Sequence, residues 1–158
     1  MKKSSQGFTL MEIILVLGLL GIIFAFTAFI TFDTYRGSSF RNERDTIIGT
    51  LQRARTESMN NVCAGSCTNS KPHGVYFTST SYTLFQGATY ASRDIAYDEV
   101  RNVPTGVQLH GLQEVIFSLL SGDATTTPSG SFDLVIQDST GHISTTTINK
   151  YGQITWTN

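Results

Sequence analysis

A stretch of 20 residues without a single charge, residues 13 to 32, most constrains how this chain can fold. As an α-helix rising about 1.5 Å per residue it would extend about 30 Å, the thickness of the hydrocarbon core of a bilayer. One carboxylate, Glu12, stands directly before the stretch, and Lys2 and Lys3 lie near the N-terminus. The sequence therefore predicts one membrane-spanning helix that begins with an acidic side chain.

Two general explanations account for the apolar stretch but leave Glu12 aside. A secretory signal peptide has a shorter apolar region followed by small residues at a cleavage site, whereas four phenylalanines crowd the far end of this stretch. In a plain single-span anchor, Lys2 and Lys3 would hold the N-terminus in the cytoplasm with the rest of the chain outside. Neither arrangement requires a carboxylate at position 12.

A local role for Glu12 is to cap its own helix. Thr9 followed three residues later by Glu12 fits the capping box, in which the two side chains satisfy free N–H groups at a helix start. A carboxylate there also interacts favourably with the helix dipole, by about 0.3–1 kcal/mol. A charge at the bilayer centre costs roughly 2.5–3.5 kcal/mol, and less at the edge. A neutral glutamine could also cap, so capping remains one of two open explanations.

The second explanation comes from a family resemblance. The sequence "KKSSQGFTLMEIILVLGLLGIIFAF" resembles the N-terminal leader and first helix of type IV pilins and type II secretion pseudopilins. The resemblance implies that a membrane-embedded peptidase cuts after Gly7 and methylates the new N-terminal amine of Phe8. It also implies that Glu12 pairs with the N-terminal amine of a neighbouring subunit when the helix packs into a filament core.

The same resemblance predicts partners and location. The partners would be other pilin or pseudopilin subunits, the prepilin peptidase and an inner-membrane assembly platform. The chain would first be a single-pass protein of the bacterial inner membrane, with its N-terminus cytoplasmic and its head outside, and then join a pilus or pseudopilus. A lone carboxylate in apolar surroundings is costly until it meets a positive charge, so pairing with Phe8 of another subunit would favour one axial register.

The remainder of the chain reads as a helix followed by a β-rich head. Apolar or small residues recur at helical spacing and share one face: Phe40, Ile47, Leu51, Ala54 and Ser58. Alternating segments predict strands at 73–78, 81–86, 114–119, 132–137, 142–149 and 153–157. Residues 121–130 read as a polar loop, and residues 87–113 as a long loop. We expect an α+β fold, with the long helix packed on an antiparallel β-sheet.

This organisation gives four segments. They are a leader (1–7), a transmembrane and assembly helix (8–32), an amphipathic continuation of that helix (33–60) and a globular head (61–158). The head resembles the GspH/FimT group of minor pseudopilins and minor pilins, through scattered matches at Leu51, Ala54, Arg55, Ile116, Phe117, Gly122, Ile148, Gly152 and Ile154. Another minor pseudopilin or a major pilin remains an alternative, although a major pilin usually has a C-terminal loop closed by a disulfide.

The two cysteines, Cys63 and Cys67 in "CAGSC", suit neither a four-ligand zinc site nor a thioredoxin-type motif. A local disulfide is the expectation outside the cytoplasm, and two free thiols are the alternative. We identify no catalytic, metal or cofactor pattern, and expect a protein that is not an enzyme. His73, His110 and His142 are scattered and are predicted to lie at the surface or at strand edges.

Charge in the head argues against nucleic-acid binding. Residues 61–158 hold four Lys or Arg against seven Asp or Glu, and Lys150 is the only cation near the C-terminus. Binding to phosphates requires clustered cations. The expected function is a minor structural subunit that helps to initiate or cap a type II secretion pseudopilus or type IV pilus. The alternative is a filament-tip minor pilin that binds DNA during natural transformation or a surface ligand.

Overall fold

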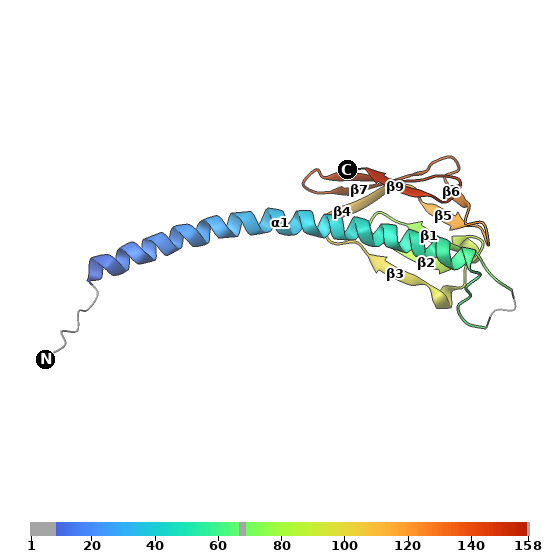
Figure 1. Ribbon diagram of the computed structural model, residues 1–158, viewed down its shortest axis with the longest axis horizontal. Helices are drawn as coiled ribbons and strands as arrows, with labels where there is room; N and C mark the ends of the chain where they lie inside the picture. The colour runs from blue at the N-terminus through green and yellow to red at the C-terminus, as the bar shows by residue number, and fades with distance from the viewer. Residues whose placement is uncertain (1–8, 67–68, 158) are drawn as a thin grey trace. The chain divides into compact units, whose positions relative to one another are not determined.

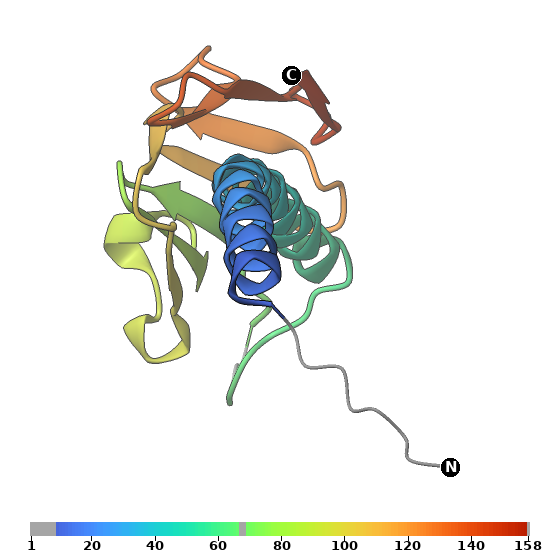
Figure 2. The same cartoon turned by 90° about the vertical axis from the view of Figure 1, so that its left-hand side faces the viewer.

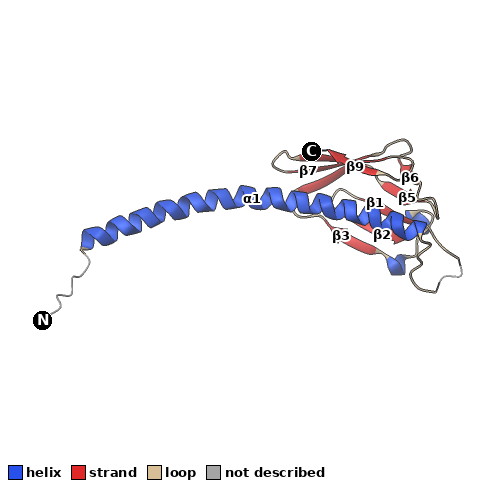
Figure 3. Cartoon of the chain, in the orientation of Figure 1, coloured by secondary structure: helices blue, strands red, loops and turns tan. Residues whose placement is uncertain are grey.

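The computed structural model describes residues 9–66 and 69–157, without the side chains of residues 28–36. One long helix, α1 (Leu10–Met59), is followed by nine strands and two short 3-10 helices (Figure 1, Figure 3). The chain forms two compact units, Met1–Ser38 and Ser39–Asn158, and α1 contributes to both. Each unit is described by itself.

The first unit is the apolar part of α1. The segment Leu10–Thr27 is long and apolar enough to cross a membrane, and none of it is buried within the protein. Its one hydroxyl near the end is satisfied inside the helix, because Thr27 Oγ1 donates to the carbonyl of Ile23 at 2.8 Å. A helix whose apolar side chains are exposed all round is suited to a lipid or protein environment rather than to water.

The second unit combines the last part of α1 with two antiparallel sheets, so the fold is α+β (Figure 2). The first sheet has the order β3-β2-β1-β5-β6 and the second the order β4-β7-β8-β9. The strands of the first sheet are β1 (His73–Phe77), β2 (Ser81–Gln86), β3 (Glu99–Asn102), β5 (Glu114–Phe117) and β6 (Ala124–Thr127). Those of the second are β4 (Val107–Gly111), β7 (Asp133–Asp138), β8 (Ile143–Ile148) and β9 (Ile154–Thr157).

The core lies where both sheets meet α1. The predicted helix face is confirmed, since Ile47, Leu51, Ala54 and Ser58 are fully buried and Phe40 is 6% exposed. Val75, Val115 and Phe117 meet this face from the first sheet, and Leu134, Ile136 and Ile148 from the second. Each such side chain contributes about 1.5–3 kcal/mol by leaving water. The alternating pattern of the strands therefore builds one core from two sheets.

Three of our expectations about the head were wrong in detail. The head has two sheets rather than one. The predicted loop 121–130 contains β6, whose Ala124 and Thr126 side chains alternate into the core. The region 87–113 is not a plain loop: it contains η1 (Tyr90–Ser92), η2 (Ile95–Tyr97), β3 and β4. The other predicted strands are confirmed to within about two residues at each end, the expected uncertainty of such boundaries.

Arg55 fastens the end of α1 to a turn associated with each sheet. Its Nε donates to the carbonyl of Gly122, between β5 and β6, at 3.3 Å, and its Nη2 donates to the carbonyl of Tyr151, between β8 and β9, at 3.1 Å. Gly152 makes this close approach possible. Its φ is +72°, and a Cβ at this position would collide with the Gly122 carbonyl oxygen.

Candidate assembly site and other candidate sites

The capping box predicted at the start of α1 is present. Glu12 Oε2 accepts hydrogen bonds from the Thr9 main-chain N–H and from Thr9 Oγ1, both at 3.3 Å. In return, the Glu12 N–H donates to Thr9 Oγ1 at 3.3 Å. The local sequence thus gives the carboxylate partners within its own helix, and these bonds offset part of the cost of placing it beside an apolar segment.

The surroundings of Glu12 are apolar and open. Glu12, Ile13, Val16 and Leu17 line a shallow groove of about 240 Å³ along one side of the helix. The neighbouring apolar side chains are 51–66% exposed at Ile13, Ile14, Leu15, Val16 and Leu17. A carboxylate in such a position is accessible to a partner that approaches along the helix. The predicted cleavage and methylation positions, Gly7 and Phe8, lie outside the described residues.

Cys63 is disulfide-bonded. The sequence contains one other cysteine, Cys67, which lies outside the described residues. Gly65, between them, has φ +81° and lies against Tyr97, so that a Cβ at position 65 would collide with the Tyr97 ring and hydroxyl. The segment that follows α1 is therefore shaped to receive an aromatic ring from η2.

The predicted surface position of His73 was wrong. Its side chain is buried, and its main-chain N–H donates to Ser58 Oγ at 2.8 Å. Its Nε2 lies 3.7 Å from Glu57 Oε2. Burial lowers the pKa of His73, opposed by Glu57, while Arg53 lowers it further. His73 is thus the first residue of β1 and is packed against α1. The sequence around it does not show that the helix covers it.

His110 is exposed on β4, and His142 follows the turn between β7 and β8. The His142 ring approaches Phe40 with centroids 5.9 Å apart, and its Nδ1 lies 2.8 Å from Asp138 Oδ2. The described residues include no group of three or more His, Cys, Asp or Glu side chains arranged to hold a metal ion. His142 therefore serves to fix a turn against the helix.

Three of the four cations of the head lie close to acidic or aromatic groups. Lys71 Nζ lies 2.5 Å from Asp94 Oδ2, and Arg93 Nε lies 2.7 Å from Asp98 Oδ2. Lys150 Nζ lies 4.9 Å from the centre of the Tyr151 ring. Lys71 and Arg93 line the same cavity and Lys150 lies outside it. The two cations at the cavity each have a carboxylate partner and so have little free charge to offer phosphates.

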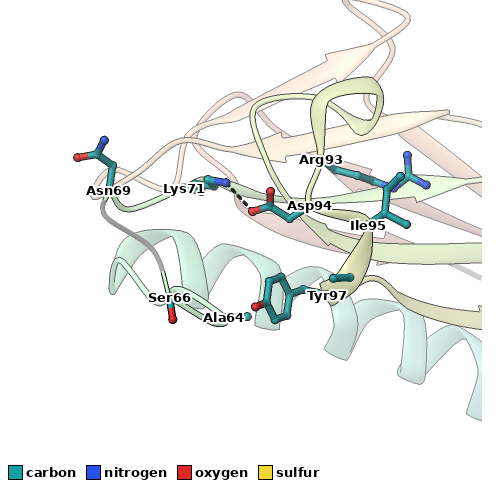
Figure 4. Close-up of a pocket in the computed structure, with 9 residues that line it drawn as sticks. Ala64, Ser66, Asn69, Lys71, Arg93, Asp94, Ile95 and Tyr97 are labelled. Carbon is teal, nitrogen blue, oxygen red and sulfur yellow. Dashed lines mark hydrogen bonds and ion pairs between the residues drawn. The ribbon is translucent and has the colours of Figure 1, made fainter.

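A cavity of about 490 Å³ opens between the segment after α1 and η2 (Figure 4). Lys71 and Asp94 lie on one side of it and Tyr97 on the other. Sequence reasoning did not identify these residues as a site. The signal available was weak, because the segment "YASRDIAYDE" mixes charged and aromatic residues without a recognisable period.

Comparisons with protein-family models, with curated proteins and with solved structures found no match for this chain.

Proposed function

We propose that this protein is a type IV pilin-like subunit, a minor pseudopilin or minor pilin that helps to initiate or cap a type II secretion pseudopilus or a type IV pilus. The observation that carries the proposal is Glu12, an accessible carboxylate near the start of the segment Leu10–Thr27, which is otherwise uncharged and of which no part is buried. The leader "KKSSQGF" before it, with its glycine at position 7, supports the same role. The GspH/FimT-like features of the head favour a minor subunit.

The proposed role of Glu12 is to pair with the amine of Phe8 on a neighbouring subunit after cleavage. Because Thr9 already hydrogen-bonds the carboxylate, the isolated subunit holds Glu12 in a satisfied state. Docking then exchanges neutral donors for a charged amine, and charge-assisted hydrogen bonds are about twice as strong as neutral ones. The exchange would favour the register in which Phe8 and Glu12 of adjacent subunits meet.

Two substitutions separate this role from simple capping. Glu12→Gln keeps a side chain that can complete the capping box but removes the charge. Thr9→Ala removes the Thr9 hydroxyl, and with it two of the three hydrogen bonds of the capping box, but keeps the charge. If the amine of a neighbour is the partner, Glu12→Gln should abolish incorporation into filaments while membrane insertion stays intact. Thr9→Ala should incorporate close to normally. The measurement is the amount of the chain in sheared filament fractions relative to the membrane.

Mass spectrometry of the N-terminus of each variant provides the control. The wild-type chain and both variants should begin at N-methylated Phe8, so that a loss of incorporation is not a loss of processing. Normal incorporation of Glu12→Gln would contradict the proposed pairing. A wild-type chain that still begins at Met1 beside an active prepilin peptidase would contradict the proposed family role and leave a single-span anchor carrying an α+β head.

We propose a structural role rather than a catalytic one, and we place DNA binding second. Clustered cations would favour DNA, whereas Lys71 and Arg93 are each engaged by a carboxylate. The proposed location is the bacterial inner membrane before assembly, with the head outside the cytoplasm. The proposed partners are other subunits of the filament, the prepilin peptidase and the assembly platform.

A further inference from the structure

The cavity between the segment after α1 and η2 is built from three separate parts of the head. Ala64 and Ser66 come from the segment that follows α1, Lys71 from the approach to β1, and Asp94 and Tyr97 from the region around η2. Figure 4 shows the Lys71–Asp94 pair facing across the opening toward Tyr97 and Ala64. Its volume, about 490 Å³, lies in the range of small-molecule sites.

A buried glutamine holds the polar side of the cavity in place. Gln86 at the end of β2 is 2% exposed, and its Nε2 donates to Asp94 Oδ2 at 3.0 Å. Its Oε1 accepts the main-chain N–H of Ala64 at 2.7 Å. One side chain from the sheet therefore positions both walls. A site held by a buried residue of a rigid strand is preorganised for a ligand.

The polar side is nearly neutral in charge but rich in hydrogen-bonding capacity. Asp94 and Lys71 form an ion pair, and the hydrogen bonds from Lys71 and Gln86 lower the pKa of Asp94. Within the described residues these bonds all reach Oδ2, which leaves Oδ1 to accept a hydrogen bond from a ligand. The Lys71 ammonium has three N–H groups, of which the ion pair uses one.

The opposite side is formed by the aromatic ring of Tyr97, with Ala64 next to it (Figure 4). Tyr97 is 43% exposed and is backed by Gly65, where any side chain would collide with its ring. Ile95 is 71% exposed and also lines the cavity. Arg93, although it lines the cavity, already donates to Asp98 and to the Tyr90 carbonyl and lies over the Tyr90 ring. The Arg93 guanidinium therefore interacts with Asp98 and Tyr90 rather than with a ligand in the cavity.

We propose that this cavity binds a neutral saccharide unit. In a sugar ring with two adjacent hydroxyls, one hydroxyl can donate to the Asp94 carboxylate while its neighbour accepts from Lys71. The C–H face of the same ring is apolar and packs against the Tyr97 side chain. A free anion would meet repulsion from Asp94, and a free cation would meet repulsion from Lys71. The proposal does not rest on the proposed function, because every residue of the site belongs to the head and none to the segment around Glu12.

The test uses the full chain in phosphatidylcholine nanodiscs, because detergents with sugar head groups would compete for the site. Saturation-transfer NMR is recorded with glucose, N-acetylglucosamine, maltose and chitobiose, each titrated to about 50 mM, well above the expected Kd of about 1 mM. At least one of these should bind, and Asp94→Asn and Lys71→Met should each weaken that binding about tenfold or more. Tyr97→Leu should remove the saturation transfer to the C–H protons of the ring.

Matched controls lie outside the cavity. Lys150→Met removes another lysine near a tyrosine, and Tyr151→Leu removes another exposed tyrosine, so both should bind sugar as the wild type does. Circular dichroism of every variant shows whether the head is folded. If Asp94→Asn does not fold, Lys71→Met alone tests the polar side of the cavity. Absence of binding by all four sugars would overturn the proposal. So would binding that Lys71→Met and Tyr97→Leu leave unchanged, or binding of only inorganic phosphate or glycine in parallel titrations.

Discussion

The Asp138 carboxylate contacts His142 at two points across the turn between β7 and β8. The His142 main-chain N–H donates to Asp138 Oδ1 at 2.9 Å, and His142 Nδ1 lies 2.8 Å from Oδ2. Thr140 adds its own N–H, at 2.9 Å from Oδ1. The His142 ring then contacts Phe40 of α1. One carboxylate therefore fixes the turn that lies against the helix.

Acid should loosen this turn. Burial by itself would raise the pKa of Asp138, but the hydrogen bonds from His142 and Thr140 outweigh it and hold that pKa well below its usual value. An acid with a depressed pKa in the folded state contributes stability that is present above its ordinary pKa of about 4 and is lost as the pH falls below it. Thermal unfolding of the full chain, compared at about pH 6 and in steps from about pH 4 down to about pH 2, should show this loss.

Asp138→Ala tests whether protonation of Asp138 causes the loss of stability in acid. The variant leaves the donors of Thr140 and His142 without their acceptor and should lower the free energy of unfolding by about 1–3 kcal/mol at neutral pH. Its melting temperature should also depend less on pH than that of the wild type in the acidic range. An unchanged acid slope would show that other carboxylates govern acid unfolding.

Glu43 should have the opposite pH dependence. It is 8% exposed, and its Oε1 has no hydrogen-bond partner among the described residues. Burial raises its pKa, against the hydrogen bond to Tyr82 and the charge of Arg101, which lower it. An acid with a raised pKa contributes stability below its ordinary pKa, and this is lost as the pH rises through the folded-state pKa.

Glu43→Gln should therefore make the head more stable at neutral pH, because glutamine is uncharged and can still bond to Tyr82. We expect the melting temperature to rise by a few degrees, corresponding to about 1 kcal/mol, at pH 7 and to change little near pH 4. Asp45→Asn on the same helix is the control, since Asp45 is largely exposed and pairs with Arg44. A drop in stability at pH 7 would contradict a costly buried charge at position 43.

The hydroxyl of Ser58 should matter more than its size suggests. Ser58 is fully buried and accepts the main-chain N–H of His73 at 2.8 Å. Ser58→Ala leaves that buried N–H unsatisfied and should cost about 1–3 kcal/mol of unfolding free energy. Thr56→Ala is the matched control, because Thr56 is exposed and its hydroxyl bonds only to the Gln52 carbonyl one turn earlier. Equal melting temperatures for the two variants would refute the role of Ser58.

Gly152 should tolerate no side chain. Gly152→Ala combines a positive φ with a collision against the Gly122 carbonyl and should lower stability by more than about 3 kcal/mol. Gly141 has φ +92° with nothing within 4 Å of the added Cβ, so Gly141→Ala measures the cost of φ alone, about 1 kcal/mol. Similar losses in urea unfolding of the two variants would mean that the contact with Gly122 adds nothing.

The strands that sequence analysis identified carry apolar residues at alternating positions. β4 has this alternation too, at Val107 and Leu109, but it was missed because it was assigned to the loop 87–113. In β7, Leu134 and Ile136 alternate with exposed or half-exposed residues, and this period is visible in the sequence. β3 was missed because all four of its residues are exposed and it has no apolar face to recognise. β6 was missed because its buried side chains are Ala124 and Thr126. These are small or polar residue types that are also common in loops, so the sequence shows no apolar alternation there.

Of the candidate sites, the one formed within a single helix could be predicted from the sequence, and the one formed by several elements could not. Thr9 and Glu12 are three residues apart, so their capping geometry follows from helical spacing and could be predicted. The cavity beside Tyr97 depends on Lys71, Gln86 and Asp94. Lys71 is 23 residues from Asp94 and Gln86 is eight, and neither spacing belongs to a helix or strand that would bring the side chains together. The burial of His73 depends likewise on Ser58 from another element. The periodicity of the sequence does not predict such tertiary contacts.

The position of Arg55 has a mechanical consequence. In addition to the core contacts of α1, one guanidinium connects the helix to the turn before β6 and to the turn before β9, because Nε donates to Gly122 and Nη2 donates to Tyr151. Load is thus shared between two sheets instead of peeling one of them from the helix. Force transmitted through α1 should therefore load both sheets of the head together.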